Sequence, residues 1–236
     1  MDIDDLQLLA GIPVNFNNIF NIYPLKLRKI AEIGYDKYNY YISLLLFSKN
    51  NFNDNKIEHI NNEEFNKASD FEIMLCFLLT DIKFKNDFMF ALELFIKEKP
   101  ILDERGFFYF GELEERRFIY NDNFNEIQNV IKLMNNIKPE KIEELDEFDK
   151  RVMEAEKKLS QYDDNEALTL NNLISSLTNM SDNDINIFNV WDLTLYQIYD
   201  QFKRGQLKEK FTIDLKSIFA GAKSEDVNLE HYVKNI

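Results

Sequence analysis

The sequence predicts a mainly α-helical protein with a small β-sheet or hairpin element and a C-terminal helical bundle. Apolar residues recur along most of the chain with a spacing near 3.6, the period of an amphipathic helix. Glycine and proline occur only six and four times, which is too few for a turn-rich β architecture. Apolar and polar residues alternate only around residues 12–22 and 100–119, so strands are expected only there.

The N-terminal residues are predicted to form a short helix followed by a β-hairpin. Residues 2–10 carry the helix, and Gly11 ends it because glycine readily adopts non-helical conformations. Residues 12–22 alternate apolar and polar side chains, as paired strands do. The pair Asn17 and Asn18 tolerates the left-handed turn conformation, so it marks the turn between the two strands.

A long helix is predicted next, from about residue 24 to residue 47. Pro24 suits its first position, where a missing backbone N–H costs no hydrogen bond. Apolar residues continue at helical spacing to Phe47, and Gly34 inside the helix would permit close packing. The Asn-rich residues 48–67 are interpreted as a loop with a short helix near its end.

The central segment is predicted to contain helices followed by short strands. Ser69 and Asp70 cap a helix over residues 71–80, and a second helix covers residues 85–97. Aromatic and β-branched residues then favour two or three short strands, at about 100–103, 107–110 and 116–119. We expect these strands to form one small sheet with those of residues 12–22.

The chain is predicted to contain two domains. Residues 1–160 form a mainly helical N-terminal domain with the small β element, and residues 168–236 form the C-terminal helical bundle. A highly charged helix over residues 138–167 connects them, and it keeps only a thin apolar stripe. Before it, residues 121–137 are predicted to be helical. The apolar face of that helix comprises Phe124, Ile127, Val130, Ile131 and Met134.

Four helices are predicted in the C-terminal bundle. Thr169 caps the first, and the second contains Trp191, the only tryptophan of the chain. The third covers residues 211–220 and stops at Gly221, and the fourth starts near Asn228. The apolar face of the first helix comprises Leu170, Leu173, Ile174 and Leu177.

The Trp191 helix is predicted to have a buried face and a partner-binding flank. Asp184 or Asn186 would cap its start, and Gly205 is a possible end. Its apolar stripe consists of Phe188, Trp191, Leu195, Ile198 and Phe202. Trp191 lies at the centre of this stripe, so we expect it to be mostly buried.

Four residues beside this stripe are candidates for binding a protein partner. Tyrosine and arginine are favoured at interface centres, and two basic residues stand out on an acidic protein. The predicted partner-binding residues are Tyr196, Tyr199, Lys203 and Arg204.

The residues show no catalytic, cofactor or metal motif, so the sequence predicts a protein that is not an enzyme. Cys76 is the only cysteine, and its apolar neighbours predict a buried, inert thiol. The two histidines, His59 and His231, are too distant in sequence to form a usual zinc site with it. Neither a Gly-x-Gly-x-x-Gly loop nor a Walker lysine occurs. The adjacent acidic pairs, such as Glu114 and Glu115, point in different directions on a helix and make no catalytic dyad.

Charge and hydropathy exclude two classes of partner. The formal net charge is −14, so a phosphate backbone would be repelled, and the best basic stretch, residues 25–29, carries too few cations to bind nucleic acid. The longest apolar runs are much shorter than the ~20 residues of a membrane span. The acidic N-terminus is unlike a secretory signal. We therefore expect an intracellular protein that binds neither nucleic acid nor membranes.

Two stretches resemble proteins encoded in the tail modules of tailed phages and prophages of Gram-positive bacteria. The first is GIPVNFNNIFNIYPLKLRKIAEIGYDKYNYYISLLLF, where that family carries a similar IYP-L-ReIaeiGydkY. The second is LNNLISSLTNMSDNDINIFNVWDLTLYQIYDQFKRGQLKEKFTIDLKSIFAGA, where the family carries a similar fNvwdLTlYQfyDqFkR. Residues of about 50–165 show no such resemblance.

The resemblance implies a role in tail assembly and brings no catalytic residues with it. The expected function is that of a non-enzymatic assembly protein, such as a chaperone that binds the tape-measure protein. The expected partners are tail proteins such as the tape-measure or tail-tube protein, met in the host cytoplasm during assembly. The alternative is a structural component of the virion, such as a tail, neck or baseplate subunit.

Overall fold

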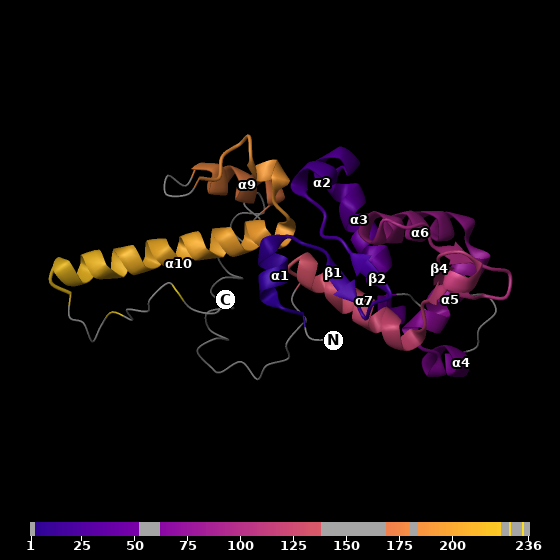
Figure 1. The fold of residues 1–236 in the computed structure, drawn as a ribbon. Coiled ribbons are helices and arrows are strands. Elements are labelled where there is room, and N and C mark those ends of the chain that lie inside the picture. The colour runs from indigo at the N-terminus through magenta and orange to yellow at the C-terminus, as the bar shows by residue number, and fades with distance from the viewer. Residues whose placement is uncertain are drawn as a thin grey trace. The chain divides into compact units, whose positions relative to one another are not determined.

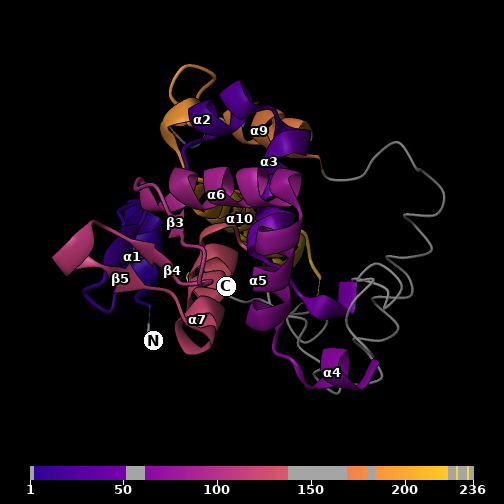
Figure 2. The same cartoon turned by 90° about the vertical axis from the view of Figure 1, so that its right-hand side faces the viewer.

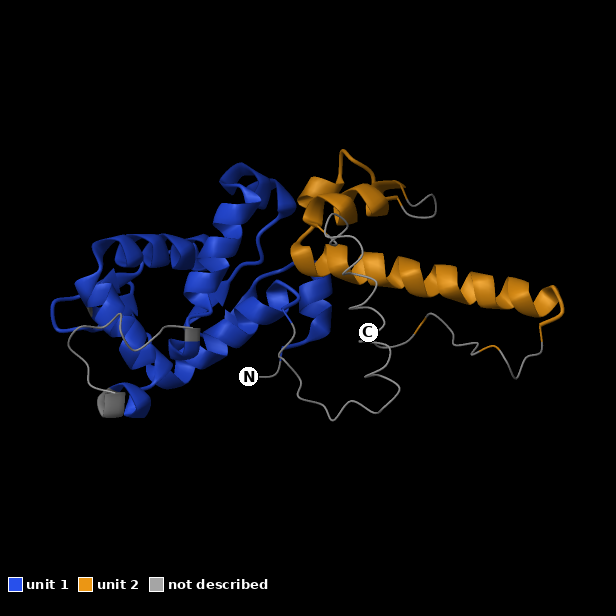
Figure 3. Ribbon diagram, turned by 180° about the vertical axis from the view of Figure 1, so that it is seen from behind, with its two compact units in different colours: residues 1–137 blue, residues 138–236 orange. Residues whose placement is uncertain are grey.

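The computed structural model describes residues 3–51, 62–137, 169–179 and 184–222, together with the single residues Val227 and Val233. The chain divides into two compact units, residues 1–137 and residues 138–236, which Figure 3 shows in different colours. The structure is mainly α-helical with small antiparallel sheets, which confirms the predicted fold class. The charged connecting helix predicted over residues 138–167 lies outside the described residues.

The N-terminal helix and hairpin are formed as the sequence predicts. Helix α1 (Asp5–Ala10) is capped by Asp4, and Gly11 ends it in the left-handed conformation. Strands β1 (Val14–Phe16) and β2 (Phe20–Ile22) pair antiparallel, with Val14 opposite Ile22. Asn17 and Asn18 have φ angles of 47° and 57°, and Ile19 N donates to Phe16 O at 2.7 Å. Both asparagines therefore occupy the left-handed turn that joins the strands.

The long helix predicted from residue 24 to residue 47 is two helices in the structure. Helix α2 (Leu27–Ile33) ends at Gly34, whose φ of 90° and ψ of 134° are not helical, and α3 (Tyr35–Leu45) begins directly after it. Glycine adopts this positive φ without the steric cost of a Cβ. Pro24 precedes α2 instead of starting the helix, so that part of the prediction is also wrong.

Local side-chain caps set the starts of the next two helices. Helix α5 (Asp70–Thr80) begins after Ser69, which forms a capping box with Glu72, so the predicted cap is confirmed. Helix α6 (Ile82–Ile96) begins three residues earlier than predicted because Asp81 caps it. Two short elements precede them, the 3-10 turn η1 (Lys49–Asn51) and helix α4 (Asn62–Lys67).

The second β element is a separate three-stranded antiparallel sheet (Figure 2). Its strands are β3 (Ile101–Leu102), β4 (Phe108–Phe110) and β5 (Arg117–Phe118), and the 3-10 turn η3 (Leu113–Glu115) lies between the last two. The positions of these strands match the prediction. The expected pairing with residues 12–22 is wrong, because β1 and β2 form a sheet of their own.

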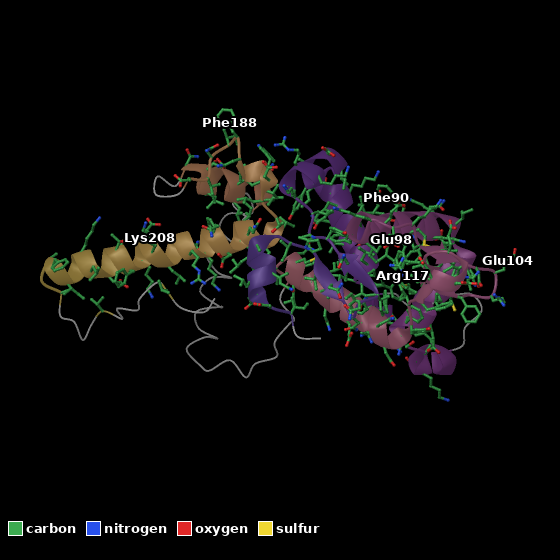
Figure 4. All side chains as sticks on the ribbon, in the orientation of Figure 1. Phe90, Glu98, Glu104, Arg117, Phe188 and Lys208 are labelled. Atoms are coloured by element: carbon green, nitrogen blue, oxygen red, sulfur yellow. The ribbon has the colours of Figure 1, made fainter. Side chains whose placement is uncertain are left out.

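Side-chain contacts connect the two sheets where backbone pairing does not. The rings of Phe20 and Phe110 have centroids 5.3 Å apart. The Arg117 guanidinium donates to Ile19 O at 2.9 Å and forms a two-point ion pair with the Glu98 carboxylate (Figure 4). The hairpin, the end of α6 and strand β5 are thereby held together.

Helix α7 (Asn121–Met134) closes the core of the first unit with its predicted face buried. Two buried polar side chains fix its position. Gln128 Nε2 donates to Leu45 O at 3.0 Å and to Phe47 O at 2.9 Å. Asn135 Oδ1 accepts from the Tyr38 hydroxyl. All three hydrogen bonds reach α3 or the residues just after it, so α7 is bonded to that helix as well as packed in the core.

The described part of the second unit contains two α-helices, which lie side by side in Figure 1. Helix α9 (Leu170–Asn179) follows Thr169, whose Oγ1 accepts from Asn172 N at 3.2 Å, and its predicted apolar face is buried. Helix α10 (Leu195–Phe219) is 25 residues long and passes through Gly205 without a break. The second and third helices of the predicted bundle therefore combine into one, and the helix predicted near Asn228 lies outside the described residues.

Candidate functional site: the Trp191 cavity and helix α10

Trp191 lies in a short 3-10 helix, η4 (Val190–Asp192), and not on helix α10. Helix α10 starts after Thr194, whose Oγ1 accepts from Gln197 N at 3.3 Å, while Gln197 Oε1 accepts from Thr194 N at 2.8 Å. Leu193, in an extended conformation, separates the two helices. The predicted caps at Asp184 or Asn186 are therefore wrong, and the capping box at Thr194 defines the start.

This later start divides the predicted apolar stripe. Leu195 and Ile198 lie on α10 and are 5% and 0% exposed, as core residues should be. Trp191 and Phe202 are each partly exposed, and most of the Trp191 side chain is buried, as expected. Phe188 lies outside both helices and is 85% exposed.

A cavity of about 540 Å³ opens beside Trp191. Helix α9 contributes one wall, and the segment before η4 contributes the other. The lining residues are Asn171, Ile174, Ser175, Thr178, Asn179, Asn186, Ile187 and Trp191. These side chains are apolar, hydroxyl or amide groups, so they provide hydrogen bonds and an aromatic face but no acid or base at neutral pH.

Asparagine side chains hold the segment before Trp191 in place. Asn186 Oδ1 accepts from Phe188 N at 2.9 Å, and Asn189 Oδ1 accepts from Asn186 N at 2.8 Å. Asn189 Nδ2 also donates to Asp184 O at 2.8 Å. This network presents Phe188 at the tip of a loop, where its ring points away from the second unit's helices (Figure 4). The helical interpretation of this segment missed that surface.

The four predicted partner-binding residues lie in the first half of α10 and are all half-buried. Tyr196, Tyr199 and Lys203 are spaced by three and four residues, so they share one face of the helix. Arg204 lies on the neighbouring face, where its Nε is 3.6 Å from Asp200 Oδ1. The helix thus brings these residues together as predicted, and their role in binding stays a prediction.

The apolar face of α10 changes side along the helix. At about 100° per residue, Leu195 and Ile198 point roughly opposite to the half-buried apolar residues of the second half. Those residues are Leu207, Phe211, Leu215 and Ile218. Gly205 lies between the two sets. The face of α10 that carries Leu195 and Ile198 therefore packs within the unit. The second apolar face lies on the opposite side of the helix.

The last two thirds of α10 are basic and partly apolar at their surface. Residues 203–219 contain five basic and two acidic residues, although the whole chain has a net charge of −14. Two apolar side chains, Ile213 and Phe219, are 54% and 84% exposed. Figure 4 labels Lys208 near the middle of α10. A basic surface with apolar side chains suits an acidic amphipathic partner.

The other candidate groups do not assemble into a site in the described part of the chain. Cys76 is a free thiol on α5 and is half-buried, so the prediction of a buried thiol is wrong. Both His59 and His231 lie outside the described residues. Within those residues, no group of three histidine, cysteine, aspartate or glutamate side chains could hold a metal ion. The same part of the chain contains no helix whose length and apolar character would let it cross a bilayer.

Comparison with known families gives a match to a phage-related domain in the second unit. Residues 160–236 match the family model of the YomV second domain, and YomV is a Bacillus prophage protein. The matched residues include both α9 and α10. This match indicates a phage-related protein, the broader part of what the sequence resemblance implied. The curated proteins and the solved structures yield no significant match.

Proposed function

We propose that this phage-related protein is a non-enzymatic tail-assembly protein that acts as a chaperone. In this proposal the second unit holds a helical segment of another tail protein, such as the tape-measure protein. The low burial of α10 is the main support for this proposal. Helix α10 has 25 residues but buries only Leu195 and Ile198, so most of its length contributes to a surface and not to a core.

The surface of α10 has the chemistry that an amphipathic helix would recognise. Exposed Ile213 and Phe219 offer apolar contacts, and the surrounding lysines offer charge to carboxylates. Helices commonly recognise one another through apolar side chains spaced by three and four residues. A long helical protein with exposed apolar faces needs such cover to avoid aggregation before it assembles.

The proposed binding surface begins at the tyrosines of α10. Tyr196 and Tyr199 provide large, rigid contact area with a polar tip, and Lys203 lies on the same face. Arg204 is oriented by its pair with Asp200. The nearby Trp191 cavity offers an aromatic wall and amide groups, which suits binding rather than acid–base chemistry.

The alternative function is that of a virion structural component. Phe188 and Phe219 are 85% and 84% exposed. Large apolar side chains at such positions would be covered in a permanent assembly, as they are in obligate interfaces. The two functions differ in where the protein is found when assembly ends.

One experiment separates the two functions and tests both. The full chain is co-expressed with tagged fragments of the tape-measure protein from the same phage, and both lysates and purified particles are analysed by quantitative mass spectrometry. A chaperone co-purifies with a tape-measure fragment from lysates and is absent from particles. A fixed copy number per particle would support the structural component. A lack of complex with every tape-measure fragment, together with absence from particles, would contradict both the chaperone function and its structural alternative.

A further inference from the structure

The first unit contains a groove that the proposed function does not use. Its cavity has a volume of about 660 Å³ and lies between the residues that follow β2 and one side of helix α6. Tyr23, Leu25, Phe90 and Leu94 give it apolar walls. Phe90, which Figure 4 labels on α6, lines this groove and is 45% exposed, so its ring is accessible to a ligand.

The walls of this groove are anchored to the core. Tyr23 N donates to Phe95 O at 2.7 Å, which fixes the residues after β2 against the end of α6. On α6, Leu92 and Phe95 are 2% and 1% exposed, so the opposite side of the helix is packed in the core. The groove is therefore a formed feature of the first unit and requires no ordering of its walls on binding.

Lysines reverse the charge of the protein at this groove. Lys26, Lys29 and Lys97 line it, and Glu93 is the acidic residue among the lining side chains. Lys29 Nζ also lies 3.0 Å from Glu32 Oε2, in a pair that is about half exposed. The net charge of the chain is −14, so three ammonium groups in one groove form a distinct local attraction for anions.

Lys97 is held in this groove by a backbone conformation that disfavours lysine. It ends α6 with φ of 60° and ψ of 20°, the left-handed position that glycine or asparagine usually occupies. Its Nζ lies 3.9 Å from the centroid of the Tyr23 ring. The cation–π contact with Tyr23 is one that a glycine at this position could not make.

We propose that this groove binds an acidic amphipathic helix of a protein partner. The apolar face of the helix would contact Phe90 and Leu94, and carboxylates beside that face would pair with the ammonium groups of Lys26, Lys29 and Lys97. The size of the cavity and its apolar walls favour a peptide over a small anion. Its location in the first unit makes this surface separate from that of α10.

The test uses the full-length protein and a designed peptide as the probe. The peptide is helical, with leucines along one face and glutamates flanking them, and the matched peptide has glutamine in place of each glutamate. Isothermal titration calorimetry gives the affinity, and amide chemical shifts locate the site. We expect the glutamate peptide to bind in the groove and to weaken as salt is added, because exposed charge pairs are screened. Equal binding of the glutamine peptide would overturn the proposal.

The decisive variant is Lys97→Gly, because it separates binding from stability. Glycine suits the left-handed position, so the melting temperature should stay unchanged or rise, while affinity for the glutamate peptide should fall on the order of tenfold. Asn136→Gly is the matched control, since Asn136 also has a positive φ of 53° but does not line the groove. Wild-type affinity in Lys97→Gly, or shifts confined to the second unit, would overturn the assignment.

Discussion

Helices α6 and α10 show how differently the two units use a helix. Helix α6 has 15 residues and buries six of them, whereas α10 has 25 residues and buries two. In the first unit, α6 thus packs into an internal core, where Phe88 lies at the centre of a group of aromatic rings. The second unit leaves most of α10, the longest helix among its described residues, at the surface. Stability should therefore be concentrated in the first unit, whereas the exposed length of α10 in the second unit should contribute little to stability and more to partner recognition.

The largest expected loss of stability comes from a substitution in the core of the first unit. Phe88 is 0% exposed, and its ring is 5.9 Å, 6.1 Å and 6.5 Å from those of Phe84, Phe108 and Phe124. Phe88→Ala should lower the free energy of unfolding by about 3–5 kcal/mol, as truncation of a core aromatic does. Phe219→Ala on α10 is the matched control and should change it by less than about 0.5 kcal/mol. Urea unfolding followed by circular dichroism measures both, and equal losses would contradict the comparison.

The next effect concerns the backbone of the β3–β4–β5 sheet. Gly111 has a φ of 82°, and an added Cβ would lie 2.7 Å from Glu115 O. Gly111→Ala should cost about 2–3 kcal/mol, because strain and a backbone clash act together. Gly34→Ala has a similar φ of 90° but no atom within 4 Å, so it should cost less, about 1–2 kcal/mol, from backbone strain alone. A smaller loss of stability for Gly111→Ala than for Gly34→Ala would contradict this prediction, because it would show that the backbone near Glu115 moves to relieve the clash.

The buried hydroxyl of Tyr38 allows a test of stability against pH. Burial raises the pKa of Tyr38 well above its ordinary value, so the folded state keeps a proton that the unfolded state loses above about pH 10. Stability should therefore fall as the pH rises beyond that point. Tyr38→Phe should remove this part of the decline and should cost about 1–3 kcal/mol at neutral pH, because the Asn135 amide oxygen loses its donor. An unchanged alkaline slope in Tyr38→Phe would contradict this explanation.

Truncation of Trp191 should cost less stability than the size of its side chain suggests. A fully buried tryptophan would cost about 3–5 kcal/mol on truncation, but this side chain is partly exposed beside a cavity. We expect Trp191→Ala to cost about 1–2 kcal/mol. Differential scanning calorimetry can compare it with Leu173→Ala, whose side chain is 0% exposed and whose loss should be larger. The reverse order would show that Trp191 belongs to the core.

Local signals in the sequence predicted much of the first unit. The Asn17-Asn18 turn, the Ser69 cap and the buried face of α7 each depend on neighbouring residues, and each was predicted. The separation of the strands into two sheets was not predicted, because strand partners depend on contacts between distant residues. The break at Gly34 was missed because apolar spacing continues across it.

The candidate site was predictable in part for the same reason. Tyr196, Tyr199, Lys203 and Arg204 were placed together because they lie within one continuous helix. The start of that helix was wrong, although Thr194 and Gln197 have the spacing of a capping box and would have marked it. The exposed loop tip at Phe188 and the cavity beside Trp191 depend on asparagine hydrogen bonds in the segment around them. The spacing of apolar residues does not predict such bonds.

The most direct test of the central claim combines Tyr199→Ala with Arg204→Ala and measures binding and stability together. Calorimetric titration of a tape-measure fragment gives the affinity, and thermal unfolding of the same samples gives the melting temperature. We predict at least about a tenfold loss of affinity, since interface tyrosines and arginines at hot spots contribute about 2 kcal/mol or more. The melting temperature should shift less than it does in Trp191→Ala. Wild-type affinity in the double variant, or unfolding as easy as that of Trp191→Ala, would contradict it.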